Sequence, residues 1–236
     1  MDPVKGLAKG PGGTLSGMTG AVLFDLYDTF VWSRWGELSD HVADRLGVDR
    51  STLHAAYDLT RPARSIGAYG SDEGDMAAIV GAAGAEPDPA LIRELTDHER
   101  AFLRDGGITL YEDSLEVAAE LRARGTKTAL VSNCSHSTIA VVEHLGLADV
   151  LDVLVLSVTA GVAKPDAGIY RDALEGVGAT ADRAVFVDDQ SRYCDGAAAL
   201  GIDTRLILRP SSRPAEGVSS DANGHRVITD LHALLR

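Results

Sequence analysis

Short, mostly apolar runs separated by helical patterns dominate the second half of the chain. The runs at 128–131, 153–156, 184–187 and 205–208 have the length of buried strands. Between them, apolar side chains recur at the three- and four-residue spacing of one helix face. Such alternation predicts a parallel sheet with helices packed on both faces, which is a three-layer α/β sandwich.

A long helical pattern without strand signals occupies residues 31–107. Leu38, Val42 and Leu46 recur every four residues, and three further helical segments follow, the last of them after Pro89. We therefore expect an all-helical insertion between the first strand of the sheet and the next βα unit.

Polar residues that can carry chemistry stand directly after the expected strands. An apolar run of four residues precedes Asp25, a charge whose burial would be costly. Ser132 and Asn133 follow the next strand, and Asp188 and Asp189 end a later one. Because open α/β sheets bind ligands at the carboxyl ends of their strands, we expect these groups to meet in one crevice.

Four motifs occur in the order found in the haloacid dehalogenase superfamily, which the chain resembles. They are DLYDT at 25–29, LVSN at 130–133, Lys164 within VAKPD, and FVDD at 186–189. The resemblance implies a Rossmann-like core formed by 21–30 and 108–236, with the insertion at 31–107 as a helical cap domain over the active site. Residues 1–20 are rich in glycine and are expected to form a disordered tail.

The resemblance also implies roles for individual residues. Asp25 would be a nucleophile that forms a covalent intermediate. Lys164 would supply positive charge to that nucleophile and to the developing anion. Ser132 would hydrogen-bond a phosphate oxygen, Asn133 would orient either a phosphate or a carboxylate, and Thr29 would lie beside the substrate or brace the loop.

A divalent cation is implied at the same place. Carboxylates gathered without a cation repel one another, whereas Mg²⁺ prefers a few carboxylate oxygens together with waters and phosphate oxygens. By resemblance, Asp25, Asp189 and the backbone carbonyl of Tyr27 would bind Mg²⁺, with Asp188 as a neighbouring ligand. The implied activity is a Mg²⁺-dependent phosphatase acting on a small phosphorylated metabolite.

Tyr27 departs from the phosphatases of the family, which have a second aspartate at this position. A phenol with an unperturbed pKa of roughly 10 can donate a proton but is a poor base at neutral pH. Tyr27 resembles instead the metal-independent 2-haloacid dehalogenases, and on that interpretation Arg61 or Arg64 would hold the halide or the carboxylate. These dehalogenases carry uncharged residues where Asp188 and Asp189 stand, so the last motif favours a phosphatase. A catalytically weak member that binds a phosphorylated ligand is a third hypothesis.

Composition adds three limits. The net charge of −13 argues against nucleic acid or an anionic membrane surface as a partner, because both repel an acidic protein. Cys134 and Cys194 are too few for a disulfide framework, and we expect both to be buried thiols. No apolar stretch reaches the roughly 18 residues of a membrane span, which favours a cytoplasmic protein.

Overall fold

The computed structural model describes residues 20–209 and 224–236. The tail expected at 1–20 lies outside the described residues, apart from Gly20. The stretch 211–224 is polar and rich in serine, proline and glycine, which predicts a loop, and it also lies outside them, apart from Gly224. In these two ranges, no helix combines the length and the apolar character that crossing a lipid bilayer requires.

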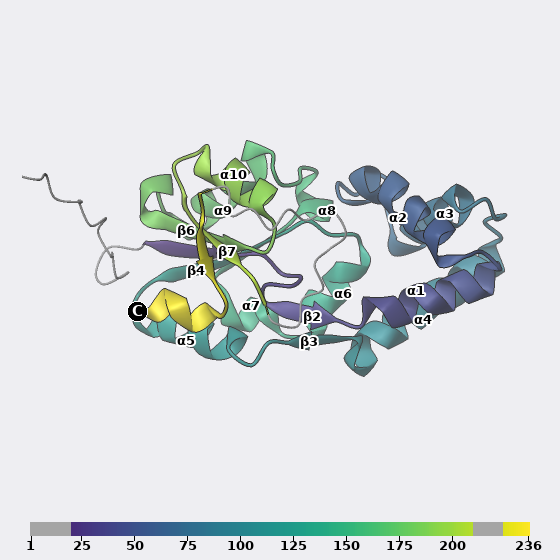
Figure 1. The fold of residues 1–236 in the computed structure, drawn as a ribbon, viewed down its shortest axis with the longest axis horizontal. Helices are drawn as coiled ribbons and strands as arrows, with labels where there is room; N and C mark the ends of the chain where they lie inside the picture. Colours follow the sequence, from purple (N-terminus) through teal and green to yellow (C-terminus); the bar gives the residue numbers. More distant parts are fainter. Residues whose placement is uncertain (1–19, 210–223) are drawn as a thin grey trace, which may run out of the picture.

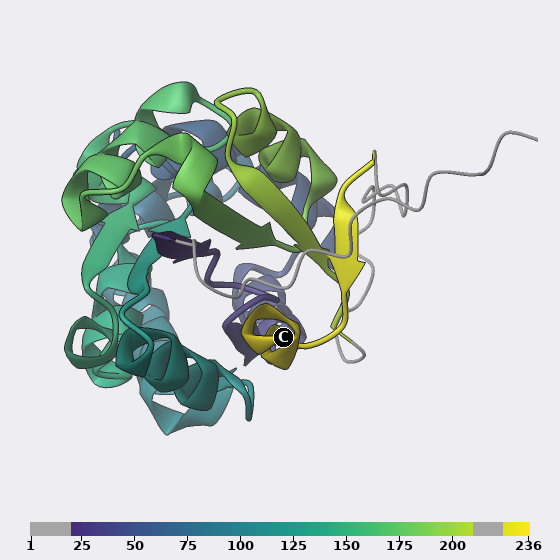
Figure 2. The same ribbon diagram turned by 90° about the vertical axis from the view of Figure 1, so that its left-hand side faces the viewer.

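Within the described residues, a parallel sheet of six strands lies at the centre of the fold (Figure 1). The strands are β1 (Ala21–Phe24), β4 (Lys127–Ser132), β5 (Val153–Leu156), β6 (Ala184–Asp188), β7 (Asp203–Ile207) and β8 (Arg226–Ile228). Their order is β5-β4-β1-β6-β7-β8, and every neighbouring pair is parallel. Figure 2 shows β8, in yellow, at one edge of the sheet. The predicted α/β fold with a parallel sheet is confirmed.

The central position of β1 brings three of the sequence motifs together. Phe24, its last residue, pairs with Leu130 of β4 on one side and with Val187 of β6 on the other. Because neighbouring parallel strands end at the same edge of a sheet, Asp25 and Asp188 stand side by side at the carboxyl edge.

Alternate residues of β1 supply two hydrophobic cores, one on each face of the sheet. Val22 and Phe24 belong to one core, and Ala21 and Leu23 belong to the other. The first core is covered by α5 (Ser114–Ala123), α6 (Ser137–His144), α7 (Leu147–Val150) and the C-terminal 3-10 helix η3 (Leu231–Leu235). The second is covered by α9 (Ala167–Val177) and α10 (Ser191–Ala198), while α8 (Ser157–Ala160) and η2 (Ala181–Arg183) are short connecting turns. Both cysteines are buried free thiols, as predicted.

Four helices form a bundle beside the sheet, which we call the helical insert (Figure 1). They are α1 (Trp35–Leu46), α2 (Arg50–Arg64), α3 (Asp72–Ala82) and α4 (Pro89–Phe102). Their apolar faces form a separate core, in which Leu38, Val42 and Leu95 are fully or almost fully buried. Asp49 and Asp88 accept backbone N–H groups at the starts of α2 and α4, which satisfies donors that a helix start leaves unpaired.

The predicted all-helical stretch from 31 to 107 is wrong at its beginning. Val31–Ser33 forms strand β2, which pairs antiparallel with β3 (Ile108–Leu110) and joins the helical insert to the rest of the chain. A π-helical turn, η1 (Leu103–Gly107), precedes β3. Three residues are too few to show the alternation by which a strand is found in a sequence. The domain boundaries themselves stay a prediction.

Candidate active site

A buried lysine lies between two aspartates at the carboxyl edge of the sheet. Lys164 Nζ donates to Asp25 Oδ1 at 2.5 Å and to Asp188 Oδ2 at 2.7 Å. Burial alone would lower the pKa of Lys164, but the two carboxylates raise it above its ordinary value. The ammonium also lies 5.4 Å from the ring centre of Phe186 and 4.9 Å from that of Tyr193, within cation–π distance. The structure therefore brings residues from the first, third and fourth motifs into contact.

Asp189 adds a third carboxylate to this group. Ligand oxygens of Asp25, Asp188 and Asp189 lie within 4.8 Å of one another. Burial and the neighbouring carboxylates raise the pKa of Asp188 to about 7 and that of Asp189 to about 9, although Lys164 opposes both shifts. A divalent cation favours the ionised form of all three side chains. The donor set therefore fits a hard cation such as Mg²⁺.

The second motif holds the lysine loop and offers a hydroxyl group. Asn133 Nδ2 donates to the Lys164 carbonyl at 2.8 Å, and Asn133 Oδ1 accepts the Lys164 N–H at 2.7 Å. The amide expected at a phosphate therefore positions the lysine. Ser132 is fully buried, and its Oγ has no hydrogen-bond partner in the described part of the chain. A buried hydroxyl without a partner costs free energy, so Ser132 fits a donor to a ligand oxygen.

Tyr27 lies near the aspartates, but its hydroxyl makes its hydrogen bond elsewhere. The phenol oxygen is 2.8 Å from Thr138 Oγ1 at the start of α6. Burial raises the pKa of the phenol above its ordinary value, and the charges of Glu99 and Asp25 act in the same direction. The phenol is therefore protonated at physiological pH and cannot act as a general base.

An arginine that sequence reasoning missed braces the first motif. Arg209 donates from Nε and Nη2 to the Thr29 carbonyl at 3.1 and 2.7 Å. Nη1 and Nη2 also donate to the Asp113 carboxylate at 2.8 and 2.9 Å, and both side chains are buried. Thr29 Oγ1 has no hydrogen-bond partner among residues 20–209 and 224–236. Thr29 therefore has a bracing contact through its backbone, while its hydroxyl can still bind a ligand.

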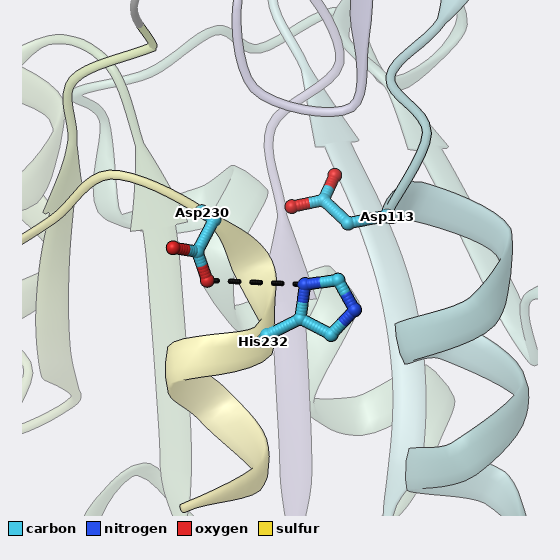
Figure 3. A group of neighbouring side chains, drawn as sticks. All are labelled: Asp113, Asp230 and His232. Atoms are coloured by element: carbon cyan, nitrogen blue, oxygen red, sulfur yellow. Dashed lines mark ion pairs between the residues drawn. The ribbon is translucent and has the colours of Figure 1, made fainter.

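A second group of ligand-type side chains has a structural role. Asp113, Asp230 and His232 face one another between α5 and η3 (Figure 3). Besides its arginine contacts, Asp113 accepts the Leu231 N–H at 2.7 Å, and Asp230 Oδ1 accepts the Ala233 N–H at 3.2 Å. His232 Nδ1 is 3.9 Å from Asp230 Oδ1. Because these carboxylates already serve an ion pair and a helix start, the group does not fit a metal site.

Two consecutive residues at the start of α6 join the core to the helical insert. His136 Nδ1 lies 2.8 Å from Oδ2 of Asp75 in α3, and the His136 N–H donates to the same oxygen at 3.0 Å. Burial raises the pKa of Glu99 of α4 to about 7, and its contact with Ser137 opposes that shift. Asp75 and Glu99 are both buried, and neither belongs to one of the four sequence motifs.

The structure places Arg61 on the exposed face of α2. Its side chain is 60% exposed and pairs with Asp58 at 2.8 Å. Arg64, almost one turn further on, is buried and donates to the Tyr57 carbonyl at 2.9 Å and to Thr60 Oγ1 at 3.0 Å. The substrate-binding role predicted for Arg61 stays a prediction. Of the two arginines, Arg64 is the buried one.

Comparisons with known proteins agree with this architecture. A family model described as haloacid dehalogenase-like hydrolase matches residues 19–201. A GMP/IMP nucleotidase of Escherichia coli is 35% identical over 109 residues, which cover 45% of this chain and 49% of that protein. An (S)-2-haloacid dehalogenase of Pseudomonas sp. is 36% identical over 110 residues, 46% of either protein. A phosphoglycolate phosphatase of Rhodospirillum rubrum is 30% identical over 210 residues, 83% of this chain and 82% of that protein. The chain thus matches about half the length of the first two relatives.

Solved structures of dehalogenases and phosphatases share the fold. An L-2-haloacid dehalogenase of Xanthobacter autotrophicus superposes with a TM-score of 0.65 at 21% identity, over 93% of this chain and 98% of that one. A HAD phosphatase of Thermococcus onnurineus gives a TM-score of 0.62 at 19% identity, over 92% and 96%. At these identities the likeness concerns the fold alone.

Proposed function

Because the chain belongs to the haloacid dehalogenase-like hydrolases, we propose that it is a Mg²⁺-dependent phosphatase of small phosphorylated metabolites. The observation that carries this proposal is the group formed by Asp25, Asp188 and Asp189, whose oxygens lie within 4.8 Å of one another. A reaction that expels a halide from carbon has no need of such a group. The nucleotidase and the phosphoglycolate phosphatase among the relatives support the same choice.

The chemistry that we propose uses Asp25 as a covalent nucleophile. Its carboxylate attacks the phosphorus of a phosphomonoester, the P–O bond to the alcohol breaks, and water later cleaves the aspartyl phosphate. Lys164, 2.5 Å from Asp25 Oδ1, offsets negative charge on the nucleophile and on the phosphoryl oxygens. Ser132 Oγ, buried without a partner among the described residues, donates to a phosphoryl oxygen.

Mg²⁺, when bound, supplies further positive charge to the phosphoryl group. Asp25, Asp188, Asp189 and the backbone carbonyl of Tyr27 would hold it. The phenol of Tyr27 is protonated and hydrogen-bonded to Thr138, so no carboxylate at this position protonates the leaving alcohol. We therefore expect esters with good leaving groups, such as aryl phosphates, to react faster than alkyl esters.

We propose further that the helical insert is the cap domain that decides substrate choice. Its support is the contact of α3 and α4 with the segment that follows the second motif, through His136 and Ser137. The β2–β3 ribbon connects this insert to the core.

A metal-independent 2-haloacid dehalogenase is the second candidate. Tyr27 favours it, and so does the 36% identity to an (S)-2-haloacid dehalogenase. In that reaction Asp25 attacks carbon, and the halide leaves without a proton, which suits a position that holds no acid–base carboxylate. The third carboxylate, Asp189, has no role in it.

The two candidates are separated by parallel assays with p-nitrophenyl phosphate and 2-chloropropionate, each with Mg²⁺ and with EDTA. We expect phosphate release that requires both Mg²⁺ and Asp25, so Asp25→Asn should abolish it. Asp58→Asn, which changes an exposed carboxylate on α2, is the matched control and should keep the activity. Halide release that EDTA leaves unchanged would replace the phosphatase proposal with the dehalogenase.

A further inference from the structure

A small cavity lies between the helical insert and the core. It is lined by Arg64, Asp75 and Glu99 from the insert and by Ser135 and Ser137 from the core, among others. The same core segment continues to Thr138, which bonds the phenol of Tyr27 in the first motif. The cavity therefore lies next to the segment that supports the phenol of Tyr27.

Carboxylates dominate the charged lining of this cavity. Asp75 and Glu99 are both buried, and Asp75 is only 4% exposed. Asp75 Oδ2 is used by His136, whereas Asp75 Oδ1 is buried and has no hydrogen-bond partner in the part of the chain that the structure describes. A buried carboxylate oxygen without a donor costs free energy, so a donor on a bound molecule would be favoured there.

Arg64, the arginine that lines the cavity, donates its hydrogen bonds to groups of its own helix. Arg64 donates to the Tyr57 carbonyl and to Thr60 Oγ1, and its guanidinium lies 5.4 Å from the centre of the Tyr57 ring. Asp72, another lining residue, is likewise paired with Arg100 at 2.8 Å. A ligand carboxylate would therefore approach two buried acidic side chains and a guanidinium that is already hydrogen-bonded.

We infer that Asp75 and Glu99 select phosphorylated substrates whose end remote from the phosphate carries hydroxyl or amino groups, and that they exclude a remote carboxylate. The inference rests on the proposed phosphatase function and names its substrate class. A hydroxyl or amino donor satisfies Asp75 Oδ1, whereas a ligand carboxylate brings no donor to that oxygen and meets the charge of Asp75 where water screens it poorly. A site built to bond a donor discriminates strongly against an analogue that lacks it.

The test uses two probes with one carbon skeleton. Glycerol 3-phosphate and 3-phosphoglycerate differ at the remote carbon, which bears a hydroxyl in the first and a carboxylate in the second. Each is measured as a competitive inhibitor of Mg²⁺-dependent p-nitrophenyl phosphate hydrolysis. We expect glycerol 3-phosphate to have an inhibition constant at least about tenfold lower. Asp75→Asn should bring the two constants close together, because the amide can point its N–H₂ into the cavity and keep its oxygen on His136.

Two control variants separate recognition of the substrate by Asp75 from the contact by which Asp75 attaches the insert to the core. His136→Gln removes the ring contact but keeps the Asp75 carboxylate, so the preference should remain. Asp58→Asn alters an exposed carboxylate and should also leave it unchanged. If the aryl ester is hydrolysed, four outcomes would overturn the inference. They are equal inhibition constants, a preference for 3-phosphoglycerate, no competition by either probe, and a preference that survives Asp75→Asn. Failure of the wild-type protein to hydrolyse the aryl ester refutes the proposed function instead.

Discussion

Replacing Lys164 with methionine should destabilise the protein at neutral pH far more than the loss of an exposed lysine. The substitution removes the ammonium that contacts Asp25 at 2.5 Å and Asp188 at 2.7 Å, and it leaves two buried carboxylates facing each other. Methionine is flexible and fills most of the volume, so the loss should report charge and not a cavity.

The loss of unfolding free energy caused by Lys164→Met can be estimated in two ways. Breaking a buried ion pair by removing one partner costs about 3–5 kcal/mol. The two carboxylates can relieve their repulsion if one takes up a proton, which costs about 1.36 kcal/mol per pH unit above an unperturbed pKa of about 3.9. That cost is about 4 kcal/mol at pH 7 and about 1.5 kcal/mol at pH 5. The destabilisation should therefore be near 4 kcal/mol at pH 7 and should shrink as the pH falls.

Urea unfolding followed by circular dichroism in EDTA, at pH 7 and pH 5, gives the two free energies. Lys127→Met is the matched control, because Lys127 is 56% exposed and its 3.1 Å pair with Asp152 should contribute less than about 1 kcal/mol. Mg²⁺ should restore part of the stability lost by Lys164→Met, since a bound cation stabilises the folded state and replaces the missing charge. A loss no larger than that of the control, or one of equal size at both pH values, would refute the reasoning.

Three further outcomes are expected. Arg209→Met should lower the free energy of unfolding by about 3–5 kcal/mol in urea, because it strands a buried carboxylate, and a loss below about 1 kcal/mol would contradict this. In EDTA, wild-type stability should fall between about pH 4 and pH 9, because Asp189, with a folded pKa of about 9, holds its proton more tightly than in the unfolded chain. Added Mg²⁺ should flatten that fall, and an unchanged curve would argue against a cation site. Gly67→Ala should lower the Tm more than Gly70→Ala: both positions have positive φ, but only at Gly67 would a Cβ lie 2.4 Å from a carbonyl oxygen of α8. Equal losses would show that this contact is unimportant.

The groups at the carboxyl edge of the sheet could be predicted because each follows a buried strand. Four apolar residues before Asp25 form β1, and the strand expected at 153–156 coincides with β5. Once those strands lie parallel, the position of Asp25 and Asp188 is determined by where the strands end. A local pattern is sufficient in such cases, because the position depends on the strand and not on a distant partner.

The contacts across the fold could not be predicted in the same way. Asp75 and His136 are 61 positions apart, and Asp113 and Arg209 are 96 apart. In the sequence, each of these side chains is expected to be exposed to solvent, because charged residues are seldom buried unless they are paired. The partner of each one is too distant in the sequence to be identified there. Only the packing of the insert against α6, and of the chain end against α5, creates the pairs.

The bonds made by residues 136–138 limit how the insert can be exchanged between related proteins. His136 is hydrogen-bonded to Asp75 of the insert, Ser137 contacts Glu99 of the insert, and Thr138 is hydrogen-bonded to Tyr27 of the first motif. An insert transplanted without carboxylates at those two places would leave the start of α6 without its partners and would loosen the support of the phenol. In a chimera, the insert and residues 136–138 therefore have to be transferred together.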